Sequence, residues 1–205
     1  MLENGNGLMF LPGEDWRKER KMKTHALNQK YNSLTEYQPE ERKEILREIL
    51  GDLNENVTLS GPVTFHYGIH TKIGRNTFIN FNFTCQDDTT VEIGEGCDFG
   101  PNVTITTAMH PMLSDERRAL MCPDGVARRL CYAMPVKIGK NCDIQYAIIA
   151  DDAVIEDGAV IGADPQSCAN PEDWGIAVIG QGAVVKAGQV VKPKEMIAPA
   201  GGEQK

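Results

Sequence analysis

The chain has 205 residues, of which 41% are hydrophobic, and it carries a formal net charge of −8 at pH 7. An acidic chain repels a phosphate backbone, and no basic stripe is interleaved with aromatic residues, so we exclude nucleic acid as a partner. The chain also lacks a run of about 18 apolar residues, and its first residues lack the basic start and apolar core of a signal peptide. We therefore expect a cytoplasmic protein without a membrane partner.

Residues 1–56 are predicted to form an N-terminal helical segment. In "QPEERKEILREILGDL", Pro39 suits a first helical turn and Glu40 complements the helix dipole. The apolar residues fall on one face and predict an amphipathic helix; they are Ile45, Leu46, Ile49, Leu50 and Leu53. The preceding "DWRKERKMKTHALNQKY" predicts a second, strongly basic helix. Its charge either steers an anionic ligand or is solvated, and we favour the solvated face.

From residue 57 an aliphatic residue recurs every sixth position and a small residue follows four places later, as in "IGRNTF", "IGEGCDF", "IGKNCDI", "IEDGAVIG" and "IGQGAVV". This internal repeat is typical of a solenoid whose short strands turn corners at Gly, Asn and Asp and point one large side chain inward. We predict a mainly β fold with the solenoid over residues 57–199. An excursion at about 111–134, a second loop at about 163–176 and a tail at 200–205 complete this division.

Further motifs accompany the repeat. The chain contains "INFN", then "DD", "IG", "GPNV" and a histidine before a proline. These motifs and the helical lead-in resemble the hexapeptide-repeat O-acetyltransferases of the maltose and galactoside group. The resemblance implies a left-handed parallel β-helix in which three hexapeptides make one triangular coil. It also implies acetyl-CoA as co-substrate, a sugar or similar small hydroxyl acceptor, and a homotrimer with its sites between subunits.

By this resemblance His110 stands at the place of the family's general base. The chemistry gives an independent reason, because an alcohol must lose its proton as it attacks a thioester and imidazole titrates near neutrality. His110 ends a regular β pattern at the lip of the polar excursion. The alternative is a surface histidine that merely ends a strand, and the surrounding motif favours the catalytic interpretation.

The resemblance assigns acceptor binding to Asn80, Asp88 and His66. Asn80 matches a residue that holds the acceptor hydroxyl, since an amide both donates and accepts hydrogen bonds, although a corner asparagine is the alternative. Asp88 matches an acidic residue that contacts the acceptor sugar, and a solvated loop carboxylate is an equal alternative. His66 lies where the family commonly has a smaller polar residue, so its role stays open.

Two parts of the chain depart from the family pattern. Leu11 and Pro12 stand where the family places an acidic acceptor-binding residue, and Glu14 or Asp15 is a candidate substitute. This departure leaves the sugar preference open.

The second departure affects the donor side. Asp143 stands at a tryptophan position of the family, and the step from Ile144 to Ile149 has five residues instead of six. A shorter step either flattens a corner or shifts the inward set of side chains. The following stretch resembles the C-terminal β-helix of ADP-glucose pyrophosphorylases, and Trp174 in its loop either packs on the solenoid or lines a donor groove, with packing favoured.

The six cysteines are interpreted as free thiols. Cys97 and Cys142 occupy the small-residue place of the repeat, where a thiol is a compact hydrophobe. Cys122 and Cys131 lie on the excursion without a second pair at ligand spacing, so we expect no metal requirement.

The leading hypothesis is therefore an acetyl-CoA-dependent O-acetyltransferase. The departures from the family pattern in the C-terminal part of the chain leave two alternatives. One is a catalytically silent β-helix that binds a sugar or nucleotide or serves in assembly, and the other is an acyltransferase with a different acyl donor.

Overall fold

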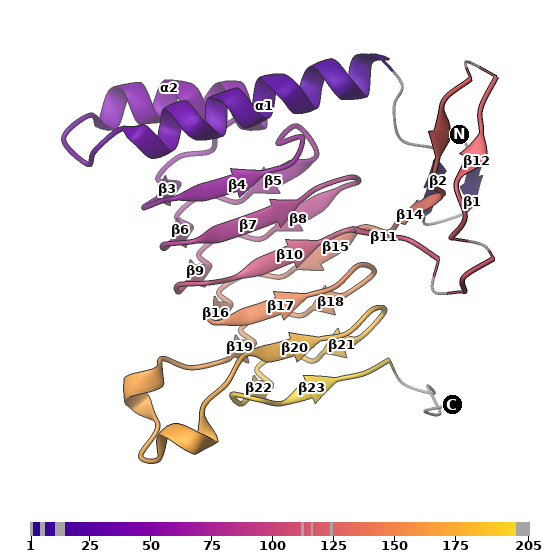
Figure 1. Cartoon of the computed structure of the whole chain (residues 1–205). Coiled ribbons are helices and arrows are strands. Elements are labelled where there is room, and N and C mark those ends of the chain that lie inside the picture. Colours follow the sequence, from indigo (N-terminus) through magenta and orange to yellow (C-terminus); the bar gives the residue numbers. More distant parts are fainter. Residues whose placement is uncertain are drawn as a thin grey trace.

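The computed structural model describes residues 2–4, 7–10, 15–111, 113–115, 117–123 and 125–199. Two helices lie across one end of a stack of short strands, and a projection leaves the side of the stack near its middle (Figure 1). The stack consists of three parallel sheets. The predicted β-helix and its N-terminal helices are therefore confirmed. Among the described residues, neither helix is long and apolar enough to cross a bilayer.

The chain visits the three sheets in turn. The first sheet contains β3 (Thr58–Leu59), β6 (Phe78–Ile79), β9 (Asp98–Phe99), β16 (Asp143–Ile144), β19 (Val160–Ile161) and β22 (Val190–Val191). The second contains β4 (Val63–Phe65), β7 (Phe83–Gln86), β10 (Thr104–Thr106), β17 (Ala147–Ile149), β20 (Ala177–Ile179) and β23 (Met196–Ile197). The third contains β5 (Thr71–Ile73), β8 (Val91–Ile93), β15 (Val136–Ile138), β18 (Val154–Ile155) and β21 (Val184–Val185). The stack is thus a triangular prism, and we name its edges 1–2, 2–3 and 3–1 after the sheets that meet there.

The residues at the sixth positions point inward and stack in register from coil to coil. In the first sheet Ile79 pairs with Phe99, which pairs with Ile144, and all three are fully buried. Burial of each such side chain stabilises the fold by about 1.5–3 kcal/mol. The corners at edge 3–1 require a left-handed residue, with φ of +57° at Asn76, +68° at Gly96, +54° at Asn141, +69° at Gly158 and +65° at Gly188. Asn and Gly tolerate this conformation best, which explains the repeat's corner residues.

The five-residue step is absorbed at one corner of edge 1–2. Ile144 and Ile149 both keep their in-register partners on the preceding coil and are fully buried. Only Gln145 and Tyr146 form this corner, whereas residues 100–102 form the corner above it, and Tyr146 adopts a φ of +45°. The shorter step therefore tightens a corner and does not shift the inward set.

Helix α2 (Pro39–Leu50) buries the predicted apolar face. Helix α1 (Asp15–Ser33) differs from the expectation of a mainly solvated helix, because part of its polar surface covers the open edge of β4. The Asn28 side chain donates to the Phe65 carbonyl (2.8 Å) and accepts from the Phe65 N–H (3.3 Å). Asn32 binds both backbone groups of Val63 in the same way, at 2.8 Å each. Side-chain amides thus replace the missing neighbouring strand.

Strand β11 (Ala108–Met109) directly precedes the excursion, which contains three more short strands: β12 (Leu120–Met121), β13 (Ala127–Arg128) and β14 (Cys131–Ala133). The N-terminal strands β1 (Leu2–Asn4) and β2 (Gly7–Phe10) join β11 and β14 in a sheet of order β1-β2-β14-β11, whereas β12 and β13 pair with each other in a separate sheet. This sheet projects from the side of the prism (Figure 1). The excursion was predicted from the break in the repeat, but its pairing with the N-terminal strands was not.

The second loop contains two 3-10 turns, η1 (Pro165–Ser167) and η2 (Pro171–Asp173). Trp174 ties this loop to the prism, since its Nε1 donates to the Ala163 carbonyl at 2.7 Å. Its ring meets the Tyr146 ring edge to face, with 5.1 Å between centroids. Trp174 therefore packs on the solenoid, as the favoured alternative predicted.

Candidate active site

Three of the four predicted site residues lie along edge 2–3. His66 follows β4, Asp88 follows β7 and His110 follows β11, so they come from three consecutive coils. Adjacent coils are separated by about 4.8 Å, the usual spacing of paired strands. Asn80 follows β6 and lies on edge 1–2, where its Oδ1 accepts from the Phe81 N–H at 2.9 Å. A single protomer therefore does not bring Asn80 to the other three residues.

The His110 ring is oriented by the excursion. Its Nδ1 lies 2.8 Å from the Leu130 carbonyl oxygen. A carbonyl oxygen only accepts, so this contact requires the proton on Nδ1 and leaves the lone pair on Nε2. Cys131 Sγ packs against the ring, 3.5 Å from Nδ1 and 4.0 Å from Nε2. Neither Leu130 nor this role of Cys131 was predicted, because both follow His110 by 20 residues or more without a repeat to fix their position.

The adjacent carboxylates on the second coil have different surroundings. Asp87 is fully buried and accepts from the N–H groups of Tyr67 (2.8 Å) and Gly68 (3.1 Å) and from the Thr71 hydroxyl (3.0 Å). Burial raises the pKa of Asp87, although these hydrogen bonds oppose the shift. Asp88 is only 6% exposed, yet its Oδ2 has no hydrogen-bond partner among the described residues. Such an acceptor is suited to a donor group from a bound molecule.

His66 lies close enough to Asp88 for the charge of Asp88 to affect its pKa. Burial lowers the pKa of His66, and the negative charge of Asp88 opposes that shift. Its ring lies against those of Tyr67 and His25, with centroids 4.6 and 5.6 Å away. A neutral imidazole carries one donor and one acceptor nitrogen, so His66 can hold a hydroxyl.

Arg17 of α1 is a further buried charge at this edge, and no motif in the sequence indicated it. Only 4% of Arg17 is exposed, and its guanidinium lies 4.8 Å from the Trp16 ring centroid and 6.0 Å from that of Tyr67. The candidate acidic substitute Asp15 begins α1. The other N-terminal positions discussed above, Leu11, Pro12 and Glu14, lie outside the described residues.

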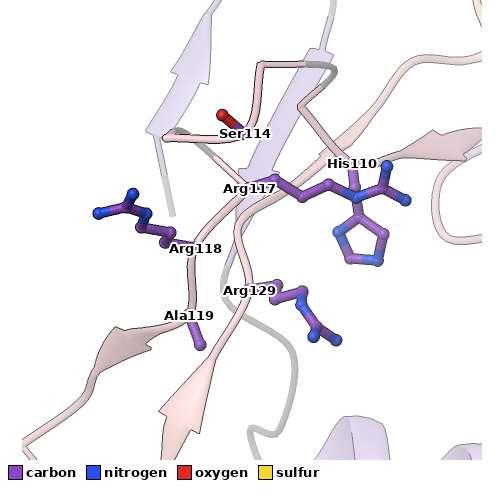
Figure 2. A pocket seen from close by; sticks show the side chains of 6 residues that line it. All are labelled: His110, Ser114, Arg117, Arg118, Ala119 and Arg129. Carbon is purple, nitrogen blue, oxygen red and sulfur yellow. The ribbon is translucent and has the colours of Figure 1, made fainter.

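A cavity of about 590 Å³ opens beside His110. This volume is within the usual range for small-molecule sites, roughly 300–1,000 Å³. It is lined by His110, Ser114, Arg117, Arg118, Ala119 and Arg129. Figure 2 shows the side chains of Arg117 and Arg129 extending to the side of the His110 ring, whereas Arg118 extends away from it. The candidate base therefore faces an open cavity.

All six cysteines are described and are free thiols, as predicted. Cys97 and Cys142 are buried at the small-residue place of the repeat. Within the described ranges, no three or more His, Cys, Asp or Glu side chains are grouped so that they could hold a metal ion.

Comparisons with known proteins identify chains of similar sequence and fold. Residues 6–54 match the family model of the maltose acetyltransferase hexapeptide capping motif. A galactoside O-acetyltransferase of Escherichia coli (strain K12) is 32% identical over 146 residues, which cover 71% of this chain and 68% of the relative. A crystal structure of a maltose O-acetyltransferase from Clostridium difficile 630 superposes with a TM-score of 0.66 at 25% identity, covering 93% and 87% of the two chains. A galactoside acetyltransferase in complex with coenzyme A gives a TM-score of 0.60 at 28% identity, covering 92% and 80%.

Proposed function

The chain belongs to the hexapeptide-repeat maltose/galactoside O-acetyltransferase family, and we propose that it moves an acetyl group from acetyl-CoA to a hydroxyl of a sugar or similar small acceptor. His110 is the general base of this proposal. The observation that carries it is the contact between His110 Nδ1 and the Leu130 carbonyl, because it presents Nε2 as the proton acceptor.

The reaction needs no covalent enzyme intermediate. His110 Nε2 takes the proton of the acceptor hydroxyl while the hydroxyl oxygen attacks the carbonyl carbon of the thioester. The bond from that carbon to sulfur then breaks, and the proton passes from His110 to the departing thiolate. One acetyl group moves to oxygen and one proton to sulfur, so the step balances.

Asp88 and His66 orient the acceptor in this proposal. The unpartnered Oδ2 of Asp88 accepts from one acceptor hydroxyl, and the neutral His66 ring binds another. Their place on the two coils preceding that of His110 supports this assignment, since each group is held by a regular strand.

In this proposal, the Asn80 that binds the acceptor beside His110 belongs to the neighbouring protomer of a homotrimer. Asn80 lies on a different prism edge from His110, so only a second copy can bring the two together. The surface near Asn80 supports an interface there, because the neighbouring Phe81 is 49% exposed and Ile148 on the second sheet is 38% exposed.

Acetyl-CoA is a substrate of the proposed reaction. The complex of a related galactoside acetyltransferase with coenzyme A supports this donor. The intact register of the coils beyond residues 145 and 146 also supports it, since the shortened corner leaves the strands of the second sheet in place.

Thiol release from acetyl-CoA with a panel of sugars tests the proposal. We expect turnover with at least one acceptor and a loss of about 100- to 10,000-fold in His110→Ala. Circular dichroism of the variant establishes that it is folded. Equal turnover in the variant, or none with any acceptor in the unaltered chain, would remove the proposed chemistry.

Mixing two inactive variants tests the shared site. Protomers of His110→Ala retain Asn80, and protomers of Asn80→Ala retain His110. If the site lies between protomers, refolding an equal mixture restores about a quarter of the sites, because each needs one copy of each variant in a fixed order. No recovery in mixed trimers refutes the assignment of Asn80 to the neighbour.

A further inference from the structure

Two arginines stand beside the candidate base. Arg117 and Arg129 line the cavity with His110 and extend toward the side of its ring (Figure 2). Arg129 directly precedes Leu130, whose carbonyl binds His110 Nδ1 at 2.8 Å. Arg117 lies in a turn, where its N–H donates to the Leu113 carbonyl at 2.9 Å. The two guanidinium groups are therefore attached to the segment that orients the base.

These positive charges contrast with the rest of the chain. The protein has a net charge of −8, yet the excursion of residues 111–134 has four arginines and three acidic residues. Arg118 binds Asp115 at 3.1 Å, and both of these side chains are largely exposed. Among the described residues, neither Arg117 nor Arg129 has an acidic partner within salt-bridge distance. Their charges are thus available to a bound anion.

We propose that the acceptor carries an anionic group, a phosphate, sulfate or carboxylate, which Arg117 and Arg129 bind while its hydroxyl meets His110. A guanidinium group is a planar fork of donors that matches the oxygens of such groups. This inference rests on acetyl transfer at His110 and names the class of acceptor. A neutral sugar forms none of these charge-assisted bonds and leaves both exposed guanidinium groups to water, so an anionic acceptor is preferred over it.

The anion belongs to the acceptor and not to acetyl-CoA. The thioester must reach the hydroxyl at His110, and the whole pantetheine arm separates the thioester from the phosphates of coenzyme A. An anion in the same cavity as the base is therefore part of the acceptor. Asp88 supports a fixed orientation, because its carboxylate repels the anionic end and attracts the hydroxyl end.

Matched acceptors that differ in charge test the proposal. We compare glucose with glucose 6-phosphate and glucuronate, and measure the ratio of kcat/KM for anionic and neutral acceptors. We expect at least one anionic acceptor to be preferred in the unaltered chain. Arg117→Gln and Arg129→Gln should each lower this ratio by about 10- to 100-fold, the range for hydrogen bonds to charged groups. Arg75→Gln is the control, because Arg75 is an exposed arginine outside the cavity that pairs with Glu95 at 2.9 Å, and it should keep the ratio within about threefold.

Calorimetric binding of glucose 6-phosphate without acetyl-CoA separates this inference from the proposed function. Binding that is lost in Arg117→Gln but kept in Arg75→Gln supports the anion site even if no acetyl transfer is found. No preference and no binding of either anionic sugar overturns it.

Two further outcomes also overturn the inference. One is a raised KM for acetyl-CoA with an unchanged KM for the acceptor in the Arg117 and Arg129 variants, which assigns these residues to the donor phosphates. The other is a lower oligomeric mass in these variants, which assigns the arginines to contacts between protomers.

Discussion

Asn28 allows a quantitative test of how helix α1 closes the first coil. Its side chain binds the N–H and the carbonyl of Phe65, and Asn28 and Phe65 are 6% and 0% exposed. Asn28→Ala leaves both backbone groups without partners where water does not reach easily. An unsatisfied buried group costs about 1–3 kcal/mol, and the 3.3 Å bond is the weaker of the two. We therefore expect the free energy of unfolding to fall by about 2–4 kcal/mol in total.

Asn32 provides a matched comparison on the same helix. It makes the same two bonds to Val63, both at 2.8 Å, but the residue is exposed. Water can replace its amide, so Asn32→Ala should cost only about 1 kcal/mol although its bonds are shorter. Urea unfolding followed by circular dichroism, at matched protein concentration, measures both values. In thermal unfolding Asn28→Ala should lower the Tm by about 5–15 °C.

The test is whether Asn28→Ala lowers the free energy of unfolding more than Asn32→Ala does. Equal losses, or a larger loss in Asn32→Ala, would mean that burial of the strand edge does not determine what the amides contribute. Helix α1 would then not stabilise the fold by covering the edge of β4.

Three other predictions concern single positions. Gly68→Ala should destabilise the fold by more than about 2 kcal/mol in urea unfolding, because its Cβ would lie 2.2 Å from the Ile49 carbonyl oxygen at a φ of +75°. Gly51→Ala, at a φ of +79° but with nothing within 4 Å, should cost about 1 kcal/mol, and equal losses would contradict the steric reason. Burial lowers the pKa of His66, so its contribution to stability is complete above the usual pKa of about 6.5 and is lost as the pH falls toward the lowered value. In His66→Gln the free energy of unfolding should therefore fall less between about pH 7.5 and about pH 5, and an unchanged fall would refute this. Asp88→Asn should raise the acceptor KM about tenfold and leave the KM for acetyl-CoA unchanged in steady-state kinetics, whereas equal changes in both would argue against acceptor binding.

The solenoid was predictable because its interactions repeat. One buried aliphatic residue at a fixed interval, such as Ile79 or Ile144, defines the strand, its inward face and its register with the next coil. His110 was identified by the point where this pattern ends before a proline. Both predictions depend on local sequence, because in a periodic fold the place of a residue in the repeat determines its place in the structure.

Other features depend on contacts between segments without a common pattern. The pairing of β2 with β14 joins residues more than 100 positions apart. The stripe of Asn28 and Asn32 has the polarity of a solvated face, and only the open edge of β4 beneath it reveals its role. Likewise, the placement of Asn80 on a different edge from His110 follows from the prism and not from the motif that contains it.

The tight corner at Gln145 and Tyr146 has a consequence for how such proteins diversify. Loss of one residue there leaves the strands on both sides aligned with their neighbours, and the long excursion at edge 2–3 likewise leaves β15 aligned with β8. The prism edges are thus modular sites at which segments of different length are exchangeable without redesign of the interior. A lineage can replace an arginine-bearing excursion by another segment and acquire a new substrate range while inheriting the same scaffold.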